Sequence, residues 1–259
     1  MRYVAVLPRV VASAVGVALV AAPAASAETS ATITGSVSPA VSPPGSPIDV
    51  TMRFTLDPVG GAEAATLSRV IFRLPRSGRL NAAFFPVCTA NAINAGKSVR
   101  VCPRGSRVGS GTVIADVSAA DVYKVPATTT FFNGSRSGRT LTMHVRALRP
   151  VDINEAIEAR VGRTGGRYGY EVHAELPESL QEIYPGWFQQ TRRFAARLGA
   201  TRRAGGRTRG FVEATRCSGG GMEPIAGEFT FRDGSIATAE NTIRCLHPRP
   251  DAPLSGGAG

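Results

Sequence analysis

Hydrophobic and polar residues alternate with a period of two along much of the chain. In residues 48–56 Ile, Val, Met, Phe and Leu occupy the even positions, whereas Asp, Thr and Arg occupy the odd ones. Because successive side chains of a strand point to opposite faces, this alternation predicts half-buried antiparallel strands. The segments with such a pattern are 30–37, 48–56, 66–74, 111–117, 128–132, 140–148, 168–176, 210–216, 227–231 and 235–243.

Helical periodicity is almost absent from the chain. The one candidate is residues 177–183, where a proline suits the first helical turn and Glu178 favours the helix dipole. Asp233-Gly234 is typical of a tight hairpin turn. The pattern therefore predicts an all-β protein, an antiparallel β-sandwich or a jelly-roll-like fold, with at most one short helix.

The N-terminus has the features of a secretory signal peptide. Arg2 and Arg9 lie before an apolar run at 10–22, and Ala25-Ser26-Ala27 matches a cleavage site. We expect residues 1–27 to be removed on export and no transmembrane anchor to remain after cleavage. The predicted location is secreted, either extracellular or associated with the cell envelope.

The rest of the chain divides into a folded region and a tail. We expect residues 28–246 to form the β-sandwich region, as one large domain or as two with a boundary near 118–127. Residues 247–259 are rich in proline and glycine, which predicts a disordered tail. The oligomeric state is not indicated by any pattern in the sequence.

The chain contains four cysteines, Cys88, Cys102, Cys217 and Cys245. An even number of cysteines in an exported chain predicts disulfides, and four cysteines allow three connectivities. Each pair of neighbours closes a modest loop flanked by strand-like sequence, which favours Cys88 with Cys102 and Cys217 with Cys245. A metal site would need closer ligand pairs, and only Cys245 and His247 come near such spacing, so we expect no metal.

The formal net charge is +11, and removal of residues 1–27 takes away two arginines and no acid, which lowers it to +9. Nearly all basic residues are arginines, with only Lys97 and Lys124 as lysines. Arginine is thus abundant throughout the chain, so the charge favours contact with acidic surfaces in general. It does not predict a specific nucleic-acid partner.

Three glycine-rich segments lack the residues that cofactor or nucleophile motifs require. Gly96-Lys97-Ser98 has Asn91 where a phosphate-binding loop needs glycine, and Gly109-Ser110-Gly111 lacks the third glycine of a dinucleotide fingerprint. Residues 134–138 place an arginine at the centre of a G-x-S-x-G pattern. We therefore expect no cofactor.

No catalytic constellation is apparent, and we assign no catalytic residue. His144 and His173 lie in predicted strands without a nucleophile motif, so we expect hydrogen-bonded or solvated histidines. A carboxylate pair for polysaccharide hydrolysis stays open as an alternative. Its candidates are Asp49, Asp57, Asp116, Asp121, Glu171 and Glu175.

Residues 184–188 contain the single tryptophan beside two other aromatic rings. Sugars stack on flat aromatic faces, so Tyr184 and Trp187 are candidates for carbohydrate binding. The alternative is a proline-glycine turn whose rings cover the end of the sandwich.

Seven arginines lie between residues 192 and 209. The apolar residues of 194–198 alternate with arginines, and Ala204-Gly205-Gly206 can reverse the chain, which predicts a hairpin with one positive side. Such a hairpin can bind anionic polymers through guanidinium forks, or its charges can simply protect a sheet edge. The candidate residues are Arg192, Arg193, Arg197, Arg202, Arg203, Arg207 and Arg209.

Several motifs between about residues 70 and 245 resemble a family of secreted, β-rich proteins of high-GC actinobacteria for which no activity is established. The resemblance implies export, β architecture and cysteine pairing, and it transfers no site. The motifs that carry it are Phe85-Pro86-Val87-Cys88, the segment 101–112 that begins Val101-Cys102-Pro103, Phe131-Phe132-Asn133-Gly134, Arg167-Tyr168-Gly169-Tyr170, and residues 217–245 with a cysteine at each end.

The sequence thus predicts an exported, non-enzymatic β-sandwich protein. We expect its partner to be an anionic polymer or polysaccharide of the cell envelope, bound through the basic hairpin. The alternatives are a polysaccharide-active hydrolase and a carbohydrate-binding module.

Overall fold

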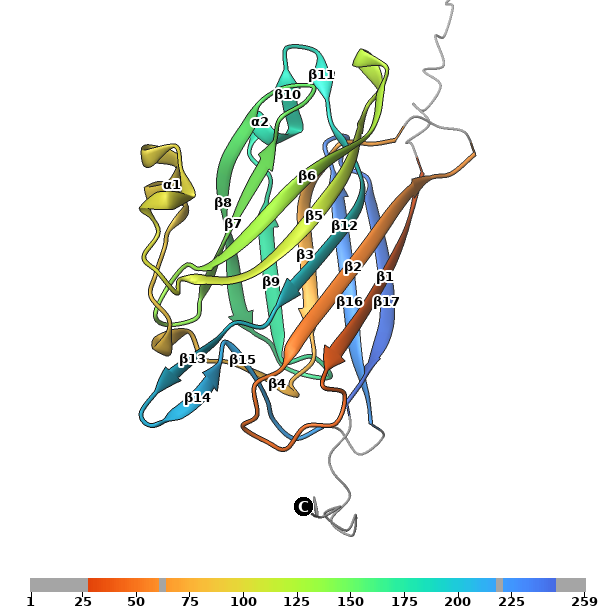
Figure 1. The fold of residues 1–259 in the computed structure, drawn as a ribbon. Helices are drawn as coiled ribbons and strands as arrows, with labels where there is room; N and C mark the ends of the chain where they lie inside the picture. Colours follow the sequence, from red (N-terminus) through yellow and green to blue (C-terminus); the bar gives the residue numbers. More distant parts are fainter. Residues whose placement is uncertain (1–27, 61–63, 218–220, 246–259) are drawn as a thin grey trace, which may run out of the picture.

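A computed structural model describes residues 28–60, 64–217 and 221–245. The predicted signal peptide and the predicted tail lie outside these ranges. Within them, eleven antiparallel strands form one sheet (Figure 1). In spatial order they are β1 (Thr29–Ser38), β2 (Asp49–Pro58), β12 (Gln190–Leu198), β5 (Arg107–Val117), β6 (Val122–Asn133), β7 (Thr140–Ala147), β8 (Ile153–Arg163), β9 (Tyr170–Glu175), β3 (Leu67–Leu74), β16 (Met222–Phe231) and β17 (Ile236–Arg244).

Three two-stranded ribbons and short helices complete the described fold. The ribbons are β10 (Glu182–Tyr184) with β11 (Trp187–Phe188), β13 (Thr201–Ala204) with β14 (Arg207–Gly210), and β15 (Val212–Ala214) with β4 (Gly78–Leu80). The helices are α1 (Ala90–Gly96), α2 (Glu178–Gln181) and the 3-10 turns η1 (Ala82–Phe84), η2 (Val99–Val101) and η3 (Ser118–Ala120). No helix in the described ranges is long and apolar enough to cross a membrane.

The large sheet curves until it nearly closes into a barrel-like sandwich. Figure 1 shows β1, β2, β12, β5 and β6 as one wall and the remaining strands of the sheet as the other. The two edge strands, β1 and β17, come together at a seam where Asn241 Nδ2 donates to the carbonyl oxygen of Ile33 at 2.8 Å. The predicted all-β, sandwich-like fold is therefore confirmed.

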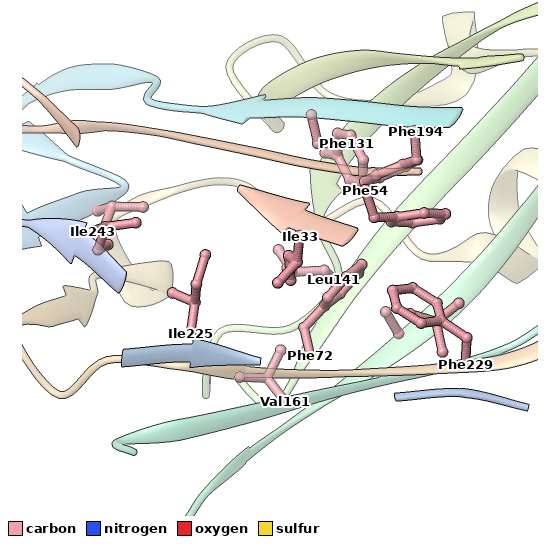
Figure 2. Packing of buried hydrophobic residues seen from close by; sticks show 14 of the residues in the cluster. Ile33, Phe54, Phe72, Phe131, Leu141, Val161, Phe194, Ile225, Phe229 and Ile243 are labelled. Carbon is pink, nitrogen blue, oxygen red and sulfur yellow. The ribbon is translucent and has the colours of Figure 1, made fainter. Parts of the chain in front are cut away.

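Phenylalanines from both walls form the centre of the core. The ring centroid of Phe54 lies 5.1 Å from that of Phe194 on its own wall and 4.7 Å from that of Phe229 on the opposite wall. Figure 2 shows these side chains, with Phe72 and Phe131, in the space between the strands. Burial of each ring stabilises the fold by about 1.5–3 kcal/mol, so this cluster holds the two walls together.

Strand β5 passes unusually close to β12. A Cβ atom at Gly109 or Gly111 would collide with the backbone carbonyl oxygens of Arg197 or Ala195. Glycine is therefore required here by the close approach of two backbones. This explains the Gly109-Ser110-Gly111 run without any role in nucleotide binding.

The described ranges contain two α-helices, so the prediction of at most one was wrong. The predicted segment 177–183 contains α2, whereas no helix was predicted at α1. Thr89 begins α1 by accepting a hydrogen bond from the Ala92 amide, and Lys97 ends it in a left-handed conformation. Gly96-Lys97 thus closes a helix, whereas a phosphate-binding loop would open one.

Strand β8 was not predicted because Glu155 and Ala156 interrupt the alternation of its apolar residues. Ala156 and Ile157 are neighbours in the chain, yet both are buried. Ala156 faces α1 on the outer side of the sheet, where Asn94 Nδ2 donates to its carbonyl oxygen at 2.8 Å, and Ile157 packs with Leu180 of α2. A strand covered on both faces loses the period of two.

Both favoured disulfides are confirmed. Cys88 bonds to Cys102 across a Cα–Cα distance of 5.2 Å, and Cys217 bonds to Cys245 across 5.7 Å. The first encloses α1, and the second joins the end of β17 to the segment that follows β15. Two such bonds are typical of an oxidising environment.

Candidate functional site

The space between the two walls is not completely filled. An apolar cavity of about 260 Å³ lies inside the nearly closed sheet. It is larger than the ~150 Å³ apolar cavities known to hold benzene. Cavities of this kind, lined mainly by hydrophobic side chains, are the usual form of small-molecule sites in β folds.

The lining of the cavity extends along the sheet from one end to the other. At the end covered by α2 and β10, here called the α2 end, it includes Pro150, Leu180 and Ile183. At the opposite end, beside β4 and β15, it includes Leu80 and Val212. The cavity is thus elongated, and its shape suits a long ligand better than a round one.

The middle of the lining comes from inward-facing positions of the strands. Val113 of β5, Val172 of β9 and Ala174 of β9 are only partly buried, although they point into the interior. Partial burial of inward-facing apolar residues means that they border free volume. The exposed Arg149 and the exposed Ala40 also belong to the lining, so the lining includes surface residues at both ends.

Few polar groups interrupt this lining. Among the described residues of the lining, only Arg149 has a formal charge, and the polar side chains are those of Ser42, Thr51, Ser77, Tyr170, Gln189 and Thr191. The site therefore offers apolar contact almost everywhere and polar contact at few points. Sequence reasoning missed this site, because alternation shows which residues face inward and not how far apart the facing walls lie.

The seven candidate arginines do not form one surface. Arg192, Arg193 and Arg197 lie on β12 in the main sheet, whereas the others lie on β13 and β14. The expected hairpin arm at 194–198 was wrong, because β12 pairs with β2 and β5. Figure 1 shows β13 and β14 as a separate small ribbon that projects from the body.

Acidic partners neutralise the arginines of β12 in part. Arg192 contacts Asp57 at 3.1 Å and Asp116 at 3.4 Å, and Arg197 pairs with Asp49. These three aspartates, which were candidates for hydrolysis, thus serve as ion-pair partners. Arg193 is exposed and forms no ion pair within the described ranges.

The ribbon β13–β14 retains most of its exposed positive charge. Arg202, Arg203 and Arg207 are exposed, and only Arg202 among them has a hydrogen bond, to the Phe84 carbonyl oxygen at 3.0 Å. Arg209 is mostly buried: it lies over the Phe84 ring and 4.0 Å from a Glu213 oxygen. The free basic surface is therefore smaller than the seven residues suggest.

The aromatic candidates lie on the ribbon at the α2 end. Tyr184 is 55% exposed, and its ring centroid lies 5.1 Å from that of Trp187. The two ring planes are tilted by 52°, so they do not form one flat platform for a sugar. The same ribbon supplies Ile183 to the cavity lining.

The described histidines are held by hydrogen bonds in strands. His144 is buried, and its Nε2 donates to Asn154 Oδ1 at 2.7 Å. His173 lies 3.3 Å from a Glu171 oxygen on the outer face of β9. The third histidine, His247, lies outside the described ranges.

Carboxylates with shifted pKa values are all paired with arginine. The hydrogen bond from Arg73 (2.8 Å) is the main cause that lowers the pKa of Glu171. The pKa of Glu240 is lowered mainly by its hydrogen bond from Arg167. The general acid of a glycosidase needs a raised pKa, so neither Glu171 nor Glu240 has the property of that acid. The described ranges contain no group of three His, Cys, Asp or Glu suited to a metal ion.

Fold and cavity together define the class of this protein as an antiparallel β-sandwich with an elongated apolar interior. Comparison of the chain with protein-family models, with curated proteins and with solved structures found no match. A functional assignment therefore depends on the chemistry of the cavity and of the surface.

Proposed function

We propose that the protein is an exported, non-enzymatic binding protein for an apolar ligand. The cavity of about 260 Å³ carries this proposal, because its lining is apolar except at a few points. Apolar surface removed from water contributes about 25 cal/mol per Å², so a hydrocarbon chain gains free energy on entering such a space. Export is supported by the features of residues 1–27 and by the two disulfides.

Filling the cavity tests this proposal. Val113 points into the interior, and Thr112 beside it on β5 is exposed. We expect Val113→Trp to weaken binding of hexadecanol by about tenfold or more, because the indole occupies volume that the ligand needs, whereas Thr112→Trp leaves binding unchanged. Displacement of the neutral dye N-phenyl-1-naphthylamine from the purified protein measures the affinity.

Thermal unfolding of both variants shows whether they are folded, since overpacking costs about 1–3 kcal/mol. If Val113→Trp is too unstable, Ala174→Phe fills the same cavity from the opposite wall. Equal affinity of a folded filling variant and the Thr112→Trp control would refute the cavity as the binding site. Absence of any dye or alcohol binding by the native protein would refute the proposed function.

A second candidate function is binding of an anionic envelope polymer by the ribbon β13–β14. Arg202, Arg203 and Arg207 support it, because they are exposed on a projecting ribbon in a chain whose net charge is +9 without residues 1–27. Guanidinium groups pair well with phosphate and carboxylate, and joint action of several charges is required at physiological salt. This function does not exclude the first, because the two sites are separate.

Replacing these three arginines with glutamine should weaken binding to polyglutamate and lower the salt concentration at which the protein is released. A matched control replaces Arg100, Arg104 and Arg136, which are equally exposed but lie elsewhere, so that the net charge changes by the same amount. Elution from an immobilised polyglutamate column gives the comparison. Equal elution of the two triple variants would show that only the net charge matters, and the ribbon would then have no specific role.

A further inference from the structure

The single charged residue of the cavity lining suggests what kind of ligand the cavity holds. Arg149 lies in the turn between β7 and β8 at the α2 end, and it is exposed. The other lining residues named at this end, Pro150, Leu180 and Ile183, are all apolar. An exposed guanidinium at one end of an elongated apolar cavity can combine a charged contact with a long hydrophobic one.

The acids nearest to Arg149 in the sequence are already engaged. Arg146 forms an ion pair with Asp152, in which Nη2 lies 3.3 Å from Oδ2. Glu155 accepts hydrogen bonds from the Ser179 hydroxyl of α2, at 2.7 Å to Oε2. Within the described ranges the Arg149 guanidinium has no hydrogen bond or ion pair. Its charge is therefore available to a ligand.

Gln189 provides a second polar contact at the same end. It lines the cavity, is only 9% exposed, and its backbone amide donates to the carbonyl oxygen of Gln181 in α2. Its side-chain oxygen accepts from the Thr191 hydroxyl at 3.0 Å, which leaves the amide nitrogen without a partner in the described ranges. The Gln189 amide nitrogen is therefore available to donate a hydrogen bond to a ligand.

We propose that the ligand is an amphiphile with one long hydrocarbon chain inside the cavity and an anionic headgroup at Arg149. This inference depends on the proposed binding of an apolar ligand and adds the chemistry of its headgroup. The elongated lining accepts the chain, and Arg149 with the Gln189 amide supplies donors at the α2 end. A long-chain fatty carboxylate such as palmitate has the required chemistry.

Palmitate and hexadecanol separate the two parts of this inference. We expect the native protein, recovered from an exporting host and freed of lipid, to bind palmitate more tightly than hexadecanol. Arg149→Gln should weaken palmitate binding by about tenfold or more, the order expected for the loss of one charge-assisted hydrogen bond, and leave hexadecanol binding unchanged. Isothermal titration calorimetry gives both dissociation constants.

Two variants serve as controls. Arg136→Gln removes an exposed arginine in the turn before β7, at the other end of that strand from Arg149, and should not change either affinity. Arg149→Lys keeps the charge and should retain part of the preference for palmitate. Equal palmitate affinity of Arg149→Gln and Arg136→Gln would overturn the headgroup assignment. If hexadecanol still binds in that case, the proposed function is retained. Failure of both ligands to bind the native protein would overturn the two proposals together.

Discussion

Glu213 is a carboxylate with no exposed surface, and it holds the end of the sheet beside β4. Arg79 Nη2 lies 2.6 Å from its Oε2, and the Gly210 amide donates to its Oε1 at 3.4 Å. Burial alone would raise its pKa, but the hydrogen bonds from Arg79, Asn81 and Gly210 outweigh burial and lower the pKa below the ordinary 4.5. The charged form is therefore favoured in the folded protein.

A lowered pKa in the folded state makes Glu213 a source of acid sensitivity. Its contribution to stability is fully present above the ordinary pKa and is lost as the pH falls through the lower folded value. We expect Glu213→Gln to destabilise the protein by about 1–3 kcal/mol near neutral pH, with a difference from the native protein that shrinks on acidification. Urea unfolding between about pH 6 and about pH 3 measures this difference.

Glu158→Gln is the matched control, because Glu158 is exposed on β8 and forms no ion pair within the described ranges. Its effect should stay within about 0.5 kcal/mol at each pH. A constant difference between Glu213→Gln and the native protein across this pH range would contradict the assigned pKa shift.

The partners of single residues could be predicted from the sequence where the two residues are close in the chain. The two disulfides join cysteines 14 and 28 residues apart, and both were predicted. Arg197 and Asp49 are 148 residues apart, and Arg192 and Asp57 are 135 apart. Their pairing depends on which strands become neighbours, so the sequence could show the arginines as a cluster but not the acids that neutralise them.

Among the elements, α1 owes its position to a disulfide, to one small hydrophobic cluster and to the two hydrogen bonds between the Asn94 side chain and the Ala156 backbone. Ile93 is 1% exposed and packs with Cys88, Phe132 and Ala156 on the outer face of the sheet. A helix of seven residues is too short to be stable alone. The cysteine bond and these contacts together fix it, which explains why helical periodicity gave no indication of it.

Removal of each disulfide should affect a different part of the molecule. In the chain-entropy description, loss of Cys88–Cys102 costs about 3 kcal/mol and loss of Cys217–Cys245 about 3.6 kcal/mol. We expect the Cys88→Ala, Cys102→Ala variant to lose amide protection in α1 before the sheet unfolds, because α1 has few other contacts. The Cys217→Ala, Cys245→Ala variant should instead destabilise the end of β17.

Hydrogen exchange of individual amides, together with denaturant unfolding of both double variants, measures these effects. Equal protection of α1 in the native protein and in the Cys88, Cys102 variant would contradict the role given to the first disulfide. Unchanged midpoints for both variants would contradict the stabilisation expected from either bond.

At the scale of the whole molecule, alternation predicted the fold class but not the cavity. The alternation in 48–56 predicted that one face of β2 is apolar, and Phe54 and Met52 of that face do point inward. Whether inward residues meet or leave a space depends on the curvature of the sheet and on the distance between its walls. Neither quantity is encoded in the pattern of one strand, so the site emerged only from the assembled structure.

The number of strands in the sheet determines the relative direction of the two edge strands at the seam. An antiparallel sheet reverses direction at every step, so its first and eleventh strands run in the same direction. β1 and β17 therefore lie parallel where they approach, and the alternating hydrogen-bonded pairs of the antiparallel ladder cannot continue across them. A side chain, Asn241, joins them instead at Ile33. Separation of β1 from β17 would therefore break no ladder of main-chain hydrogen bonds, whereas separation of any other two neighbouring strands of the sheet would break one.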